Sequence, residues 1–143
     1  MKRIIKSTVC VLFITLLITG CNKDENFPTY EPPDWSVDIN AGYYENMTAV
    51  VKIPDNLAKN TDENDKLAAF ASDGKCRGVG VPINGLYFVS IKGVPEDQTS
   101  IHFMYYSARN KYLYQTDELC TFDANQSFGL VDEPQMLPLN IVK

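Results

Sequence analysis

The sequence predicts an all-β fold, a single antiparallel β-sandwich of about eight short strands formed by residues 35–143. Apolar side chains in this region alternate with a period of two, the spacing of a strand that buries one face. Turn signals recur about every ten residues. Helical periodicity over eleven or more residues is confined to the first 20 residues, so an α/β fold is not expected.

The expected strands follow one another through short connections. In the first, Met47, Ala49, Val51 and Ile53 share one face. Asp-Gly at 73–74 and Asn-Gly at 84–85 each lie between apolar runs, which is typical of a hairpin turn. Pro138 has no amide hydrogen, so we expect it at a sheet edge or a bulge. The expected strands are 47–53, 67–71, 76–81, 86–91, 101–106, 111–114, 119–122 and 136–142, and residues 55–59 could form one helical turn.

The first 20 residues have the features of an export signal. Lys2, Arg3 and Lys6 form a basic start, and residues 9–18 are uncharged and mostly apolar. This stretch is shorter than the roughly 20 apolar residues that a membrane-spanning helix needs. A basic start, a short apolar core and small residues at its end are typical of a signal peptide.

The segment Leu17-Ile18-Thr19-Gly20-Cys21 closely resembles the lipobox of bacterial lipoproteins. In that family the cysteine thiol is linked to a diacylglycerol and the chain is cut before the cysteine. The resemblance implies a lipoprotein signal peptide at 1–20 and, at 21–34, a lipidated Cys21 with an acidic tether. Two or more acyl chains would hold the protein stably in a membrane. The alternative is a plain signal peptide with a coincidental cysteine.

Two further resemblances concern cellular location and fold. Residues 22–25 (NKDE) resemble the acidic export tag of surface lipoproteins from Bacteroides-type bacteria, which implies a lipid-anchored protein of the outer membrane that faces the cell surface. The periplasmic leaflet is the alternative. The runs 67–70 (LAAF) and 76–78 (CRG) resemble a pattern in small β-sandwich domains of such lipoproteins. That family has no agreed activity, so the resemblance implies only the fold and the cellular location.

Charge argues against two classes of partner. The chain has 13 basic and 18 acidic residues, and three of the basic ones lie in residues 1–20, so the remainder has a net charge of −8. Nucleic acids and anionic lipids are bound by basic patches. We therefore expect no nucleic-acid partner, and contact with the membrane only through the anchor at Cys21.

Cys76 and Cys120 remain after Cys10 leaves with the signal and Cys21 takes lipid. Paired cysteines of exported proteins usually form disulfides. A Cys76–Cys120 disulfide would close a loop of 43 intervening residues and stabilise the fold by roughly 3–4 kcal/mol in the entropic model. Two buried free thiols, or one reactive thiol, are the alternatives.

The residue inventory favours a protein without catalytic activity, cofactor or metal. His102 is the single histidine, and no nucleophile elbow, zinc-binding helix motif or phosphate-binding glycine loop is present. A cysteine–histidine pair is conceivable, but a histidine at the strand surface is expected. Asp62, Glu63 and Asp65 supply oxygen ligands for calcium, but they lack the glycine and distal glutamate of a calcium loop, so a solvated turn is expected.

Four residues are candidates for ligand binding. Arg77 could form a forked ion pair with a carboxylate of its own domain or with a ligand. Tyr106, Tyr112 and Tyr114 could stack on sugar rings if they face outward, or close the core if they do not. The sequence thus predicts a non-enzymatic envelope lipoprotein that binds or supports another molecule. A glycan-binding module, an assembly subunit or inhibitor that pairs through an edge strand, and a hydrolase with an unrecognised carboxylate site are the alternatives.

Overall fold

The computed structural model describes residues 25–143. The predicted signal peptide, the lipidation site Cys21 and residues 22–24 of the predicted tether lie outside this range. Within it, no helix has the length and apolar character needed to cross a membrane. The only helix in the described range is the four-residue turn α1 (Asp55–Ala58), at the position where one turn was expected.

The all-β prediction is confirmed, with ten strands in the described range rather than about eight. The long strands occur where alternation or apolar runs predict them, and most of the additional strands have two residues each. The strands are β1 (Glu45–Lys52), β2 (Lys66–Ala71), β3 (Cys76–Ile83), β4 (Leu86–Gly93), β5 (Ser100–Ser107), β6 (Tyr112–Gln115), β7 (Cys120–Thr121), β8 (Ser127–Phe128), β9 (Gln135–Met136) and β10 (Asn140–Ile141).

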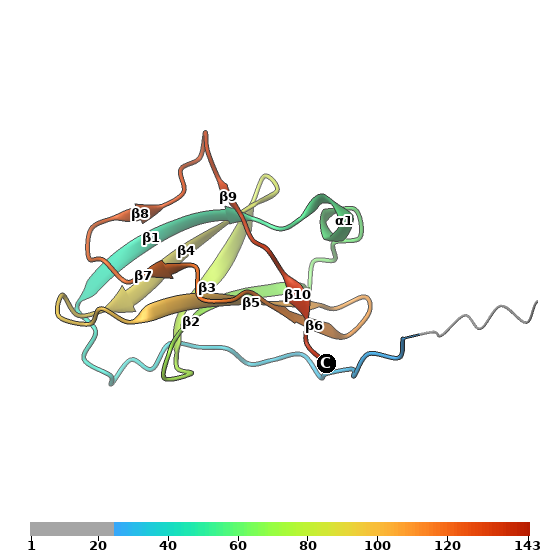
Figure 1. The fold of residues 1–143 in the computed structure, drawn as a ribbon, viewed down its shortest axis with the longest axis horizontal. Helices are drawn as coiled ribbons and strands as arrows, with labels where there is room; N and C mark the ends of the chain where they lie inside the picture. Colours follow the sequence, from blue (N-terminus) through green and yellow to red (C-terminus); the bar gives the residue numbers. More distant parts are fainter. Residues whose placement is uncertain (1–24) are drawn as a thin grey trace, which may run out of the picture.

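The strands form one curled, open sheet with the order β10-β6-β5-β2-β3-β4-β1-β8 (Figure 1). β3 joins its two halves, because its first residues pair with β2 and its residues from Gly80 to Ile83 pair with β4. β8 and β9 pair with β1 in parallel, so the prediction of a wholly antiparallel fold is wrong for these two pairs. The reason is that the chain returns along the free edge of β1 in the direction of β1 itself.

The strand expected at 136–142 is divided in two. β9 pairs with β1 and β10 pairs with β6, so this segment crosses from one end of the sheet path to the other. Pro138 lies between the two short strands, where no ladder bond requires an amide hydrogen. Leu137 is fully buried at the crossing, and its amide donates to the Lys52 carbonyl over 2.9 Å.

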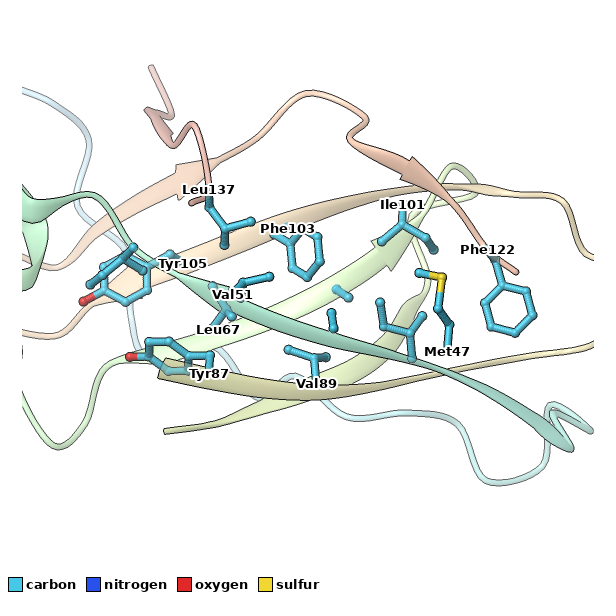
Figure 2. Packing of buried hydrophobic residues seen from close by; sticks show 14 residues of the cluster. Met47, Val51, Leu67, Tyr87, Val89, Ile101, Phe103, Tyr105, Phe122 and Leu137 are labelled. Atoms are coloured by element: carbon cyan, nitrogen blue, oxygen red, sulfur yellow. The ribbon is translucent and has the colours of Figure 1, made fainter. Parts of the chain in front are cut away.

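The core lies inside the curl of the sheet (Figure 2). Met47, Ala49, Val51 and Ile53 are all buried in it, so the face predicted from their alternation is confirmed. β4 and β5 supply the opposite walls of the core. The core residues of these strands are Tyr87, Val89 and Ile91 from β4 and Ile101, Phe103 and Tyr105 from β5.

β2 is buried on both faces, which explains why residues 67–71 form an apolar run without alternation. The outer face of β2 and its neighbours is contacted by residues 27–35, which we name the N-terminal strap (blue in Figure 1). Trp35 packs edge-on against Phe70 at 5.5 Å between ring centroids, and Phe27 packs likewise against Tyr112 at 5.7 Å. The described part of the predicted tether therefore contacts the β domain.

Candidate functional site

A pocket of about 310 Å³ opens where the loop between α1 and β2 faces the β3–β4 hairpin. We name it the Tyr87 pocket. Its apolar wall consists of Ile53, Pro82 and Leu86, and its polar groups come from Tyr87 and from the carboxylates of the loop before β2. A volume of this size is at the lower end of the range for small-molecule sites.

The β3–β4 turn sets the position of Tyr87. Asn84 and Gly85 have φ angles of +50° and +78°, as a type I′ two-residue turn requires. The turn fixes the register of β4, so that Tyr87 lies on the inner face opposite Val51. The residue is only 7% exposed, and its ring lies 6.4 Å from that of Tyr105.

Asp65 ties the polar side of the pocket to β5. Its Oδ2 accepts a 2.5 Å hydrogen bond from the Tyr105 hydroxyl and a 2.8 Å bond from the Asp62 amide, and its Oδ1 accepts a 2.8 Å bond from the Ala108 amide. The loop itself is a polar turn, because the Asn64 amide donates to Asp62 Oδ1 at 2.9 Å. Among residues 25–143, no three histidine, cysteine, aspartate or glutamate side chains are placed so that they could hold one metal ion.

Burial and charge keep the two inner tyrosines protonated. Burial, with a smaller contribution from the Asp65 carboxylate, raises the pKa of Tyr87 to about 12. Burial and the hydrogen bond to Asp65 also raise the pKa of Tyr105 far above its ordinary value. Both groups are therefore neutral phenols at physiological pH. The Tyr105 hydroxyl donates a hydrogen bond to Asp65, whereas the Tyr87 hydroxyl has no hydrogen-bond partner among the described residues.

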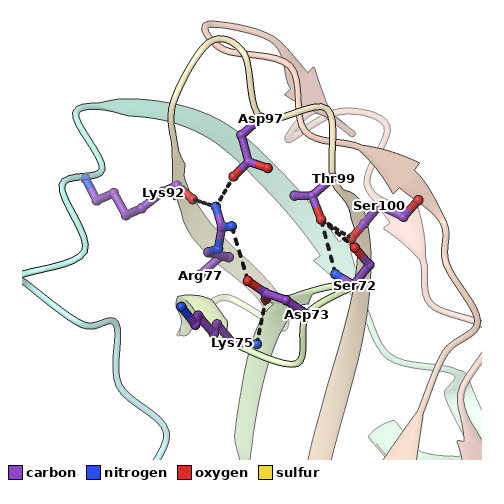
Figure 3. A network of polar contacts seen from close by, with 8 residues as sticks. All are labelled: Ser72, Asp73, Lys75, Arg77, Lys92, Asp97, Thr99 and Ser100. Carbon is purple, nitrogen blue, oxygen red and sulfur yellow. Dashed lines mark hydrogen bonds and ion pairs between the residues drawn. The ribbon is translucent and has the colours of Figure 1, made fainter.

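Arg77 is buried at the other end of the sheet, where it joins several elements of its own domain (Figure 3). Its Nη1 donates to Asp97 Oδ2 at 2.5 Å and to the Lys92 carbonyl at 3.2 Å. Its guanidinium carbon lies 4.2 Å from the centroid of the Tyr43 ring, and Asp73 is 4.0 Å from Nη2. Of the two roles considered for Arg77, an ion pair within its own domain is the one present in the structure.

The three tyrosine candidates do not form an exposed platform. Tyr106 is 1% exposed and donates its hydroxyl to the Tyr30 carbonyl at 3.2 Å, so its ring is not available for stacking on a sugar. Tyr114 packs against the core, and its ring lies 6.1 Å from that of Tyr105. Tyr112 is half-buried against Phe27. The N-terminal strap accounts for much of this burial, and its packing is not visible in strand periodicity.

The predicted Cys76–Cys120 disulfide is not formed, and both thiols are free. Cys76 pairs with β2 and Cys120 pairs with β5, so the two central strands β2 and β5 lie between them. Strands are spaced about 4.8 Å apart, whereas bridged Cα atoms must lie within about 7 Å. Burial raises the pKa of Cys76, and raises that of Cys120 to about 11, which disfavours a reactive thiolate.

His102 is not paired with either cysteine thiol. Its ring stacks on Phe70 at 5.6 Å on the outer face of β2 and β5. Burial lowers the pKa of His102, with Glu118 acting in the opposite direction. The imidazole thus belongs to the layer under the N-terminal strap.

Neither the inward position of Tyr87 nor the pairing of Asp65 with Tyr105 is among the sites predicted from the sequence. The Asn-Gly turn and the alternation of β4 were sufficient signals for an inward Tyr87. The approach of Asp65 to Tyr105 depends on the pairing of β2 with β5, which local patterns do not specify.

No protein family matches the chain, and neither a curated protein nor a solved structure matches it.

Proposed function

We propose that the chain is a non-enzymatic lipoprotein of the outer membrane, anchored through Cys21 and facing the cell surface, whose β domain is a binding or structural module. The observation that carries this proposal is the lipobox-like segment that ends at Cys21. Its short apolar core fits an exported chain better than a spanning helix, and two acyl chains are sufficient for stable anchoring. The Tyr87 pocket supports a binding role for the domain.

The packing of the N-terminal strap adds a geometric consequence to this proposal. Strap contacts with the domain begin at Phe27, six residues after Cys21. Six residues span at most about 20 Å when fully extended. A lipid on Cys21 would therefore hold the β domain close to the membrane surface.

The finer description of the fold, a β-sandwich, also remains a proposal. Its support is that the two halves joined by β3 enclose a common core between them.

The alternative functions have less support. Glycan binding needs rings that are accessible for stacking, and Tyr106 is buried while Tyr112 and Tyr114 are half-buried. Pairing through an edge strand needs a run of free backbone groups, and the strands at the two ends of the sheet path have two residues each.

The anchor is tested by metabolic labelling of the full chain with an alkyne fatty acid, followed by membrane fractionation. We expect label and membrane retention for the natural sequence, and loss of both for Cys21→Ala. Cys120→Ala is the matched control and should keep both. Surface exposure is tested by protease treatment of intact cells. An unlabelled natural chain, or a Cys21→Ala variant that stays with the membranes, would refute the anchor. Digestion only after cell lysis would refute surface exposure.

A further inference from the structure

The Tyr87 hydroxyl is a polar group in the wall of the Tyr87 pocket that no side chain or backbone group of the described residues pairs with. The residue is more than nine-tenths buried and lines the Tyr87 pocket, and its hydroxyl has no hydrogen-bond partner among residues 25–143. Its neighbour Tyr105 has its hydroxyl at the same end of the core (Figure 2), and that hydroxyl donates a hydrogen bond to Asp65. Arg77 Nε is the one fully buried side-chain polar atom without a partner among the described residues, so the Tyr87 hydroxyl itself is accessible to water in the pocket. A ligand with a polar group would replace this water as the hydrogen-bond partner of the hydroxyl.

The charge around the pocket favours a ligand of positive charge over one of negative charge. Asp62, Glu63 and Asp65 line it, and no lysine or arginine is among the residues that the structure places in its wall. Asp65 is engaged with Tyr105 and Ala108, and one oxygen of Asp62 is engaged with Asn64. Glu63 is exposed and has no ion-pair partner in the described part of the chain. The free negative charge at the rim attracts cations and repels carboxylates and phosphates.

The same contacts argue against a bare metal ion. Both Asp65 oxygens already accept bonds from N–H or O–H donors, so they are poorly placed to coordinate a cation directly. A calcium ion needs six to eight oxygen ligands. The wall formed by Ile53, Pro82 and Leu86 offers none from its side chains and fits hydrocarbon instead.

From these observations we infer that the Tyr87 pocket binds a primary ammonium group carried on an apolar carbon chain. The hydrocarbon lies against Ile53, Pro82 and Leu86, and the ammonium group donates hydrogen bonds to the Tyr87 hydroxyl oxygen and the carboxylates at the rim. This inference rests on the proposed binding role of the domain and is independent of the lipid anchor. The same chemistry is offered by a free alkylamine and by a lysine side chain of another protein.

The test is calorimetric titration of the full chain, purified in detergent, with n-pentylamine. The neutral analogue 1-pentanol and the anionic analogue hexanoate serve as ligand controls. We expect saturable binding of the amine only, weakened by added salt because screening reduces the attraction of the rim carboxylates. N-acetyl-lysine methylamide distinguishes the two sources: tighter binding than pentylamine identifies a lysine side chain, and weaker binding identifies a free amine.

Matched variants assign the binding to this pocket. Glu63→Gln and Tyr87→Phe should each weaken amine binding about tenfold, the effect of losing one hydrogen bond to a charged group. Glu133→Gln, an equivalent change on an exposed loop elsewhere, should leave the affinity unchanged. Circular dichroism checks that the variants keep the fold. Absence of saturable amine binding, equal binding of pentanol, or full affinity in both pocket variants would overturn the inference. Fatty-acid labelling of Cys21 would still decide the anchor separately.

Discussion

At the scale of single residues, the protonation of Tyr87 couples the pocket to the stability of the domain. The pKa of this group is about 12 in the folded protein, whereas an exposed tyrosine in the unfolded chain titrates near 10. Below pH 10 the Tyr87 phenol is protonated in both the folded and the unfolded chain, so its contribution to the free energy of unfolding is fully present. As the pH rises from about 10 to 12 the unfolded chain loses its proton first, so the free energy of unfolding falls.

We therefore expect the melting temperature to fall steeply above pH 10. Tyr105 should contribute in the same direction, because its pKa is also raised. Tyr87→Phe has no phenol proton at this position, so its melting temperature should fall less steeply over the same range. Thermal unfolding followed by circular dichroism at pH 8 to 11 measures both. A melting temperature of the natural sequence that does not change with pH, or an equal fall in melting temperature for the two proteins, would contradict the raised pKa of Tyr87.

Individual residues also mark where sequence reasoning succeeds. The buried set Met47, Ala49, Val51 and Ile53 follows from alternation, because a strand places every second side chain on the same face. Alternation does not say whether the opposite face is covered. Tyr106 was therefore a candidate for binding, although the Tyr30 carbonyl and the strap bury it.

At the scale of elements, β3 is the strand on which the curled sheet depends, because it pairs with β2 and then with β4. The change of partner brings β3 very close to β4. A Cβ atom on Gly78 would lie 2.5 Å from the Ser90 carbonyl oxygen and 2.9 Å from a methyl group of Val89. Only glycine fits there without moving the two strands apart.

We expect Gly78→Ala to lower the free energy of unfolding by about 1–3 kcal/mol, the usual cost of overpacking. Val79→Ala is the control, since Val79 is the next residue of β3 and is 41% exposed. Its cost should stay below about 1 kcal/mol. Urea unfolding monitored by far-ultraviolet circular dichroism gives both values. Equal stability of Gly78→Ala and the natural sequence would show that β3 and β4 can separate at this point without cost.

The hairpins were predictable from the sequence because their signals are local. Asn84-Gly85 specifies its turn within two residues, and both have the positive φ that the turn needs. The pairings of β7 to β10 are different, because two residues are too few to show a period. The crossing of residues 135–141 between the ends of the sheet is set by contacts distant in sequence, such as the Leu137 amide with the Lys52 carbonyl.

At the scale of the whole molecule, the N-terminal strap determines where the stable unit begins. The sequence predicts a domain at 35–143, with a tether before it. The strap, however, supplies the carbonyl of Pro33 to the Lys66 ammonium at 2.6 Å and receives a hydrogen bond from Tyr106 at Tyr30. The Tyr30 amide donates to the Lys111 carbonyl at 2.8 Å. These contacts connect the strap to β2, β5 and the β5–β6 turn.

A chain that starts at residue 35 should therefore be less stable than one that starts at residue 25. Without the strap, Tyr106 loses its cover and its hydroxyl partner, and Lys66 loses the Pro33 carbonyl. Uncovering an aromatic side chain of this size costs about 1.5–3 kcal/mol, so we expect a total loss of about 2–4 kcal/mol in the free energy of unfolding. Urea unfolding of the two chains measures the difference. Glu31→Ala in the longer chain is the control, because Glu31 is 89% exposed and its substitution should change little.

Trp35, the single tryptophan, reports on the strap directly. In the longer chain its emission should change at the same urea concentration as the circular dichroism signal, whereas an earlier change, or equal stability of the two chains, would show that the strap is not part of the cooperative unit.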